Sequence, residues 1–214
     1  MPPLVAAREA RHTATVWEHL EPGDLFVIEY RDGADDGRPI PWATRFVSWD
    51  GSILALYHRF PVGVEGTFVM RIADRSVTGN SSRIEWPYAH CLSLLRPCDA
   101  HVIGHEWDID WTFQGWRIGL QSPLRPTPSG LQTTEWPSLD FIVQPDGSYA
   151  WQGDNPHNDA DYLLSKEQLR AAATEAARIK AAPPWPTGWE SWRPATDWPP
   201  LSLPEEWRRA DSDV

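Results

Sequence analysis

The stretch ATRFVSWDGSILALYHRF, residues 43–60, predicts two β-strands joined by a tight turn. Both halves are rich in β-branched and aromatic residues, which favour strands. Asp50-Gly51 between them is a pair typical of the short turn of a β-hairpin. The stretch is therefore a good β-hairpin signal.

Similar short runs recur on both sides of this hairpin, and no helical pattern separates them before residue 152. Pro145-Asp146-Gly147 supplies a second turn. Many short strands joined by turns predict an antiparallel sheet that curls into a barrel over residues 12–152. The expected strands are residues 12–20, 24–31, 43–49, 52–60, 64–72, 101–107, 116–121, 139–144 and 148–152.

A helix is expected over residues 165–182. Ser165 and Gln168 have the spacing of a capping box, and Pro183-Pro184 ends the helical pattern. The apolar face is thin, so the helix is expected to lie on the sheet. That face consists of Leu169, Ala172, Ala176 and Ile179.

The tail, residues 183–207, alternates Trp and Pro without any period and is expected to wrap over the surface and bury its tryptophans there. We therefore predict a single domain over residues 1–214. Its class is β-rich α+β: a curled antiparallel β-barrel with a C-terminal helix and a Trp/Pro-rich wrapping tail.

Composition limits the partners. The net charge of −11 argues against a nucleic-acid backbone as the main ligand, because that role needs clustered Lys and Arg. No apolar run is long enough to span a membrane, and the first residues lack the apolar core of a signal peptide, which predicts a cytoplasmic protein. Cys91 and Cys98 are interpreted as structural thiols.

Two polar pairs are candidates for chemistry. His101 and His105 share one face of an expected strand and could bind a metal, although histidines paired to the backbone are the commoner case. Asp108 and Asp110 would likewise share a strand face, either as an ordinary half-buried pattern or as paired carboxylates inside the barrel.

Asp140 interrupts an apolar run on an expected central strand, so its carboxylate must be paired, hydrogen-bonded or bound to a cation. Glu135 could join it at the entrance of that strand. Further on, Asp154, Asp159 and Asp161 could supply oxygen ligands for Mg²⁺ or Mn²⁺. A solvated loop of turn-forming residues is the alternative explanation for that stretch.

Taken together, FQGWRIGLQSPLRPTPSG, LDFIVQPDG, YAWQGD and WESWRPATDWPPLSLPEEW resemble the FomD-like family of bacterial phosphohydrolases over roughly residues 107–207. The family includes nucleoside di- and triphosphatases and the hydrolase that releases CMP from a cytidylyl phosphonate in fosfomycin biosynthesis. The resemblance implies a curled antiparallel β-barrel closed by C-terminal helices, with Mn²⁺ or Mg²⁺ at one mouth.

This chain departs from the family pattern at the residues that carry its chemistry. The family usually has W-Y-V-N-L-E where this chain has WRIGLQ, so Gly119 stands at the Asn of the metal and phosphate site. The acidic cluster before the Leu-Asp pair survives as Glu135 and Asp140. The W-K-D-E-D-E run is here WQGDNP, which replaces the lysine by Gln152 and keeps only Asp154.

Three hypotheses follow. The first is metal-independent cyclisation, isomerisation or dehydration of a small molecule in a biosynthetic pathway, with no cofactor. The second is a hydrolase of nucleotide phosphoanhydrides that uses Mn²⁺ or Mg²⁺ held by Asp140, Asp154, Asp159 and Asp161, with Glu135. The third is a non-catalytic module for a small ligand; a homodimer is left open. The candidate catalytic residues are Glu135, Asp140, Arg117, Asp108, Asp110 and His101.

Overall fold

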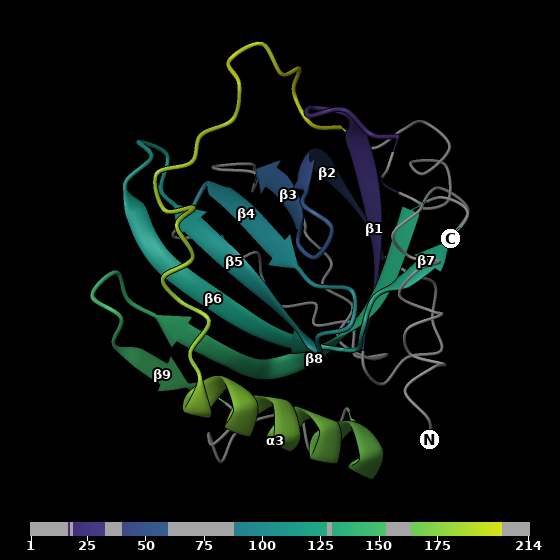
Figure 1. The fold of residues 1–214 in the computed structure, drawn as a ribbon, viewed down its shortest axis with the longest axis vertical. Coiled ribbons are helices and arrows are strands. Elements are labelled where there is room, and N and C mark those ends of the chain that lie inside the picture. Colours follow the sequence, from purple (N-terminus) through teal and green to yellow (C-terminus); the bar gives the residue numbers. More distant parts are fainter. Residues whose placement is uncertain are drawn as a thin grey trace, which may run out of the picture.

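The computed structural model describes residues 17, 19–32, 40–59, 88–127, 130–152 and 164–202, which form one curled sheet and one long helix (Figure 1). The helix, α3, spans Lys166–Ala181. The strands are β1 Leu25–Asp32, β2 Ile40–Trp49, β3 Leu54–Arg59, β4 His90–Leu95, β5 His101–Trp107, β6 Phe113–Gln121, β7 Arg125–Thr127, β8 Gly130–Val143 and β9 Tyr149–Trp151.

The sheet closes on itself. Strands β1 to β6 pair in sequence order, β6 pairs with β8, and β8 returns to β1. The first part of β8 pairs with β1 and β7, and its last part pairs with β6 and β9. The predicted barrel is therefore confirmed, with one correction: β1 and β8 are parallel. A parallel pair needs a long connection, which the chain provides by running round the barrel between them.

The hairpin of residues 43–60 forms as predicted, through β2 and β3. Asp50 Oδ1 accepts hydrogen bonds from the backbone N–H groups of Ser52 and Ile53, which fixes the turn. Gly51 has a φ of +94°, a value that residues with a side chain rarely adopt.

Other strand predictions need correction. Near the start of the chain, Trp17 and Leu20 form a turn where residues 12–20 were expected to be a strand. Residues 64–72 lie outside the described residues. Strands β4 and β7 were not predicted, and β8 begins at Gly130 rather than residue 139. Every residue of β4 is buried, so its sequence lacks the alternation that marks a half-buried strand.

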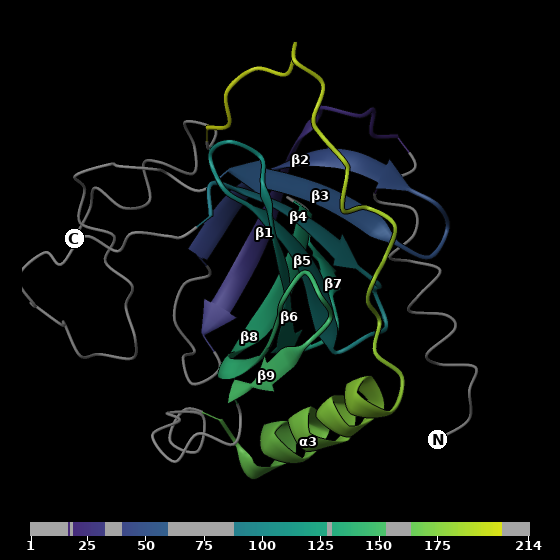
Figure 2. The same cartoon turned by 90° about the vertical axis from the view of Figure 1, so that its left-hand side faces the viewer.

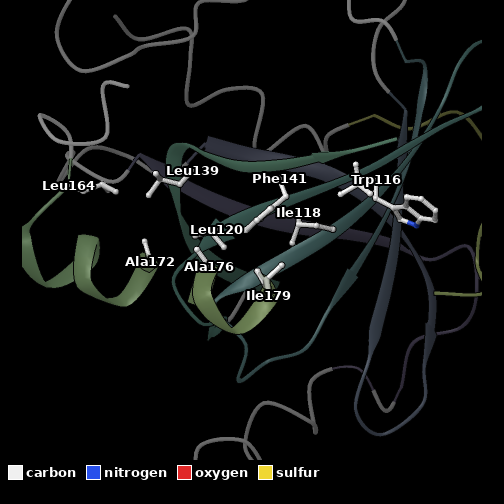
Figure 3. Packing of buried hydrophobic residues seen from close by; sticks show 10 residues of the cluster. Trp116, Ile118, Leu120, Leu139, Phe141, Leu164, Ala172, Ala176 and Ile179 are labelled. Carbon is white, nitrogen blue, oxygen red and sulfur yellow. The ribbon is translucent and has the colours of Figure 1, made fainter. Parts of the chain in front are cut away.

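Helix α3 covers the outer side of β6 and β8 (Figure 3). Ser165 and Gln168 form the predicted capping box. Ala172, Ala176 and Ile179 are buried, whereas Leu169 packs at the edge. The cluster between helix and sheet comprises Trp116, Ile118, Leu120, Leu139, Phe141, Val143, Leu164, Ala172, Ala176 and Ile179.

The tail runs from α3 along the outside of the sheet towards its far end (Figure 2). Trp107 Nε1 donates to the carbonyl of Glu190, and Arg45 donates to the carbonyls of Pro199 and Pro200. Trp189, Trp192, Trp198 and Leu201 pack against the outer face of β3 to β5. The predicted wrap is confirmed up to residue 202, and residues 203–207 lie outside the described part.

The inside of the barrel is apolar towards one end. Its buried cluster draws residues from non-neighbouring strands, as an enclosed core must. The members are Trp17, Phe26, Ile28, Phe46, Leu54, Leu56, Leu95, Leu124 and Leu131. Within the described residues, no helix has the length and apolar character needed to cross a membrane.

Candidate functional site

Towards the other end, the inside of the barrel is polar. Glu106 of β5, Arg117 of β6 and Asp140 of β8 meet there, together with Tyr88, which precedes β4. We call these four residues the Arg117 cluster.

Strand alternation explains why these polar side chains point inward. Arg117 lies between Trp116 and Ile118, which pack on the outer side beneath α3. Gly119, two residues further along β6, faces Val102 of the inner core and Asp140. The apolar neighbours therefore fix which face each polar group takes.

Arg117 joins the two carboxylates. Its Nε donates to Glu106 Oε1 at 3.1 Å, and its Nη1 donates to Asp140 Oδ2 at 3.2 Å. The Tyr88 ring centroid lies 5.8 Å from the guanidinium carbon. The Arg117 side chain is 37% exposed, whereas Glu106 and Asp140 are 11% and 20% exposed. The arginine thus remains accessible while its partners are largely enclosed.

The electrostatics follow from this enclosure. Burial raises the pKa of Glu106 and of Asp140, and the positive charge of Arg117 only partly offsets the effect. Burial alone would lower the pKa of Arg117, but Glu106, Tyr88 and Asp140 raise it above its ordinary value. Arg117 therefore keeps its charge, and the carboxyl groups hold protons more readily than exposed carboxyls do.

Three further side chains lie beside the Arg117 cluster. His58 and Cys91 are directly opposite across β3 and β4, and Trp42 of β2 packs edge-on against His58. Burial lowers the pKa of His58 to about 4 and raises the pKa of the Cys91 thiol. His58 is thus neutral at pH 7 and Cys91 is an unreactive thiol, which agrees with a structural role.

The prediction that Asp108 and Asp110 share a strand face is wrong. Both lie in the turn between β5 and β6, because Asp108 Oδ1 accepts hydrogen bonds from the backbone N–H groups of Asp110 and Thr112. Asp108 Oδ2 accepts another from Gln114. The Asp108 carboxylate therefore organises this turn, and Asp110 is exposed within it, so the two are not a carboxylate pair inside the barrel.

His101 and His105 do share a face, but it is the outer one. His101 Nδ1 lies 2.5 Å from Glu175 Oε1 of α3, within a network that includes Arg178. His105 hydrogen-bonds to Thr187 of the tail and to the carbonyl of Leu92. Each histidine therefore fastens an outer segment to the sheet.

The remaining acidic candidates are placed only in part. Glu135 belongs to β8, where its backbone pairs with Gln121 and Asp32, and its side chain lies outside the described part. Asp154, Asp159 and Asp161 lie outside the described residues. Of the predicted site residues, the structure thus brings Arg117 and Asp140 together. The side chains of the other proposed metal-binding residues are not among the described ones.

The described residues do not fit a divalent cation at Asp140. Such a cation needs several oxygen ligands with net negative charge. Here Arg117 already occupies Asp140 Oδ2 and shares Glu106. Within the part of the chain that the structure describes, no group of three or more His, Cys, Asp or Glu residues could hold a metal.

Glu106 and Tyr88 were not among the predicted site residues. Glu106 lies in the stretch HVIGHEW, where the two histidines are the more conspicuous residues. An available signal was that Glu106 alternates with His105 and Trp107 on an apolar strand. Like Asp140, Glu106 is a carboxylate within a buried strand, and such a carboxylate needs a hydrogen-bonding or charged partner.

A groove of about 290 Å³ lies elsewhere, between α3 and the end of the sheet. Lys180 is the only polar residue among the described residues that line it. Leu139, Trp151, Leu169 and four alanines make up the rest. These described lining residues include no set of groups that could carry out acid–base chemistry, whereas the Arg117 cluster does, so we take the Arg117 cluster as the candidate site.

Comparison with known proteins places the chain in a family. It is 30% identical over 185 residues to the cytidylyl-2-hydroxypropylphosphonate hydrolase of Streptomyces wedmorensis, which covers 80% of this chain and 86% of that protein. The chain belongs to the FomD-like family. A second FomD-like relative, the hydrolase of the same name from Streptomyces fradiae, is 30% identical over 122 residues, or 53% of this chain and 58% of that protein. No family profile matches the chain.

Solved structures agree with the FomD-like fold. The phosphatase SC4828, solved with the non-hydrolyzable nucleotide GPCP, is 29% identical and superposes with a TM-score of 0.66 over 88% of this chain and 97% of that chain. FomD in complex with CDP is 25% identical, with a TM-score of 0.61 over 85% of this chain and 97% of that chain. The predicted family and curled barrel are therefore confirmed.

Proposed function

We propose that this FomD-like protein hydrolyses a nucleotide-linked phosphate or phosphonate inside the barrel, with Arg117 facing the phosphoryl group. The observation that carries the proposal is the accessible guanidinium of Arg117, held between Glu106 and Asp140. Arginine suits this role because its planar fork matches phosphate oxygens. The substrate is a small molecule, and no nucleic-acid partner is proposed.

The reaction would add water to phosphorus and break the bond to a bridging oxygen. The water oxygen becomes a phosphoryl oxygen, one water proton goes to Asp140, and the bridging oxygen leaves with the nucleotide or the other half of the substrate. Asp140 Oδ1 suits the role of proton acceptor because Oδ2 is the atom that Arg117 binds. Arg117 would neutralise charge that develops on the phosphoryl oxygens.

The comparisons favour hydrolysis over the cyclisation, isomerisation or dehydration considered from sequence. The relatives are named as hydrolases of a cytidylyl phosphonate, and the structural neighbours were solved with nucleotides. A cytidylyl phosphonate and CDP are therefore the first substrates to test. Neither set of names supports the metal-independent repurposing, which stays a hypothesis.

The test is hydrolysis followed by phosphorus NMR with the purified protein, without added metal and with Mn²⁺. Arg117→Met removes the charge, and Arg170→Met on the exposed side of α3 is the matched control. We expect turnover of at least one nucleotide substrate, lowered about 100-fold or more by Arg117→Met, which corresponds to loss of one oriented charge contact. Arg170→Met should retain turnover.

Absence of turnover with tight binding of CDP would favour the non-catalytic binding module instead. Equal turnover by wild type and Arg117→Met would contradict the assignment of Arg117. Both results can be distinguished from misfolding by checking that the variant unfolds cooperatively.

A further inference from the structure

We propose that Arg117 takes the place of a divalent cation beside Asp140, so that this carboxylate is not a metal ligand in the native protein. The inference rests on the proposed function only for the identity of the ligand that Arg117 would face. Its core is a statement about charge inside the barrel, and it can be tested without any substrate.

The geometry is that of a bridged carboxylate pair. Glu106 and Asp140 come from different strands and accept from two different nitrogens of one guanidinium, Nε and Nη1, at 3.1 and 3.2 Å. The guanidinium thus supplies these two carboxylates with the positive charge that a divalent cation would otherwise bring. Because Arg117 is a fixed positive charge, a second cation placed within a few ångströms of it would be repelled.

The charge count points the same way. With both carboxyls ionised, Glu106, Asp140 and Arg117 sum to a single negative charge. Sites for Mg²⁺ or Mn²⁺ draw on several oxygen ligands, and Asp140 Oδ2 is already engaged. The opposite residue on β6 is Gly119, which offers no side-chain ligand.

One alternative keeps a metal in the protein without Asp140. The Glu135 side chain and the residues Asp154, Asp159 and Asp161 lie outside the described part, so they could bind a cation among themselves. The test therefore asks specifically whether Mn²⁺ affinity depends on Asp140, and whether removal of the Arg117 charge creates a new site.

The experiment is titration of the metal-stripped full chain with Mn²⁺ alone, followed by electron paramagnetic resonance of free Mn²⁺. Asp140→Asn retains an oxygen that can accept from Arg117, so it preserves the local hydrogen bond. Arg117→Met removes the charge, and Arg117→Lys retains it as the matched control. The double variant Arg117→Met/Asp140→Asn shows whether any new site uses Asp140.

We expect Asp140→Asn to change Mn²⁺ affinity less than tenfold. If the wild-type chain does not bind Mn²⁺, the variant should not bind it either. Arg117→Met should strengthen Mn²⁺ binding at least tenfold, Arg117→Lys should not, and the double variant should lose the gain. A tenfold or greater weakening by Asp140→Asn in the otherwise native chain would overturn the inference, as would a smaller gain in Arg117→Met. If Arg117→Met does not fold, Asp140→Asn alone decides the question. Since no nucleotide is present, these outcomes are independent of whether hydrolysis is observed.

Discussion

Gly119 of β6 lies directly opposite Asp140 of β8, and a Cβ atom added at Gly119 would lie 3.4 Å from Asp140 Oδ1. Any side chain at this position would therefore be in van der Waals contact with Oδ1 and with Val102. Oδ1 is the atom that the proposed function assigns as the acceptor of the water proton, because Arg117 binds Oδ2.

Gly119→Ala should therefore fold well but crowd the carboxylate. Its Cβ meets Asp140 and Val102 at ordinary contact distances. We expect the free energy of unfolding to change by less than about 1 kcal/mol, because alanine also restricts the unfolded chain. Urea unfolding checks the stability, and hydrolysis rates should fall because the space beside Oδ1 narrows.

Gly115→Ala is the contrasting variant on the same strand. Gly115 has a φ of +125°, and a Cβ there would collide with the carbonyl oxygen of Val143. A loss of about 3 kcal/mol or more is expected from the strain and the clash together. Equal losses of unfolding free energy in Gly119→Ala and Gly115→Ala would show that the space around Gly119 cannot hold a methyl group.

Arg117→Met should destabilise the protein more at pH 8 than at pH 5. In the folded state the pKa values of Glu106 and Asp140 are raised by burial, with Arg117 opposing the rise. A raised carboxyl pKa favours folding at low pH, and this contribution is lost as pH rises through the folded value. Removing Arg117 raises the folded-state pKa values of Glu106 and Asp140 further. More stability is therefore lost at pH 8, where the buried carboxyl groups must ionise, than at pH 5.

The expected loss is about 1–2 kcal/mol at pH 8, discounted because Arg117 is partly exposed, and smaller at pH 5. Urea unfolding at the two pH values measures it. The same loss at both pH values would mean that the two carboxyl groups do not depend on Arg117 for their charge.

Acid should destabilise the protein through its buried histidines. Burial lowers the pKa of His58, of His90 and of His105 to about 4 from an ordinary value of 6.5. The unfolded chain therefore binds protons below pH 6.5 that the folded chain does not, so stability falls from pH 6.5 towards 4. Each such proton contributes a slope of about 1.4 kcal/mol per pH unit.

His105→Leu isolates one of these groups. It also removes the hydrogen bond to Thr187, so its stability at pH 7 is expected to be lower. The informative quantity is the slope of unfolding free energy against pH between 6 and 5, which should decrease by one proton. An unchanged slope would show that His105 titrates normally in the folded protein.

Trp198 should contribute to stability by packing the C-terminal tail against the outer face of the sheet. It lies against Gly23, with ring contacts to Tyr57 and Trp192 at 6.3 and 6.2 Å. Trp198→Ala is expected to cost about 2 kcal/mol, less than a fully buried tryptophan because the site is partly exposed. Ile109→Ala, in an exposed turn, is the control and should cost less than about 0.5 kcal/mol. Thermal unfolding with no difference between them would contradict tail packing.

The features of the fold that depend on residues close together in the sequence were predicted correctly. The Asp50-Gly51 hairpin, the Ser165 capping box and the Trp/Pro tail each depend on residues close in sequence, and all were confirmed. Strand β4 was not predicted, because every residue in it is buried and its sequence does not alternate between apolar and polar residues as a half-buried strand does. The parallel pairing of β1 with β8 joins distant residues, which no local pattern encodes.

The candidate site was only half predictable for the same reason. The carboxylate Asp140 was conspicuous because it interrupts an apolar run, and Arg117 was one of several polar candidates for the pocket. Their ion pair, and the part played by Glu106, depend on the register between β5, β6 and β8. Asp108 was misassigned because its turn hydrogen bonds compete with strand geometry.

The central claim is that a phosphoryl group binds at Arg117 inside the barrel. It is tested most directly by a crystal structure of this chain with a non-hydrolyzable analogue of CDP. The claim predicts phosphoryl oxygens within hydrogen-bond distance of the Arg117 guanidinium and on the same side of the sheet as Asp140. An analogue bound on the outer face, or inside the barrel with its phosphates away from Arg117, would contradict it.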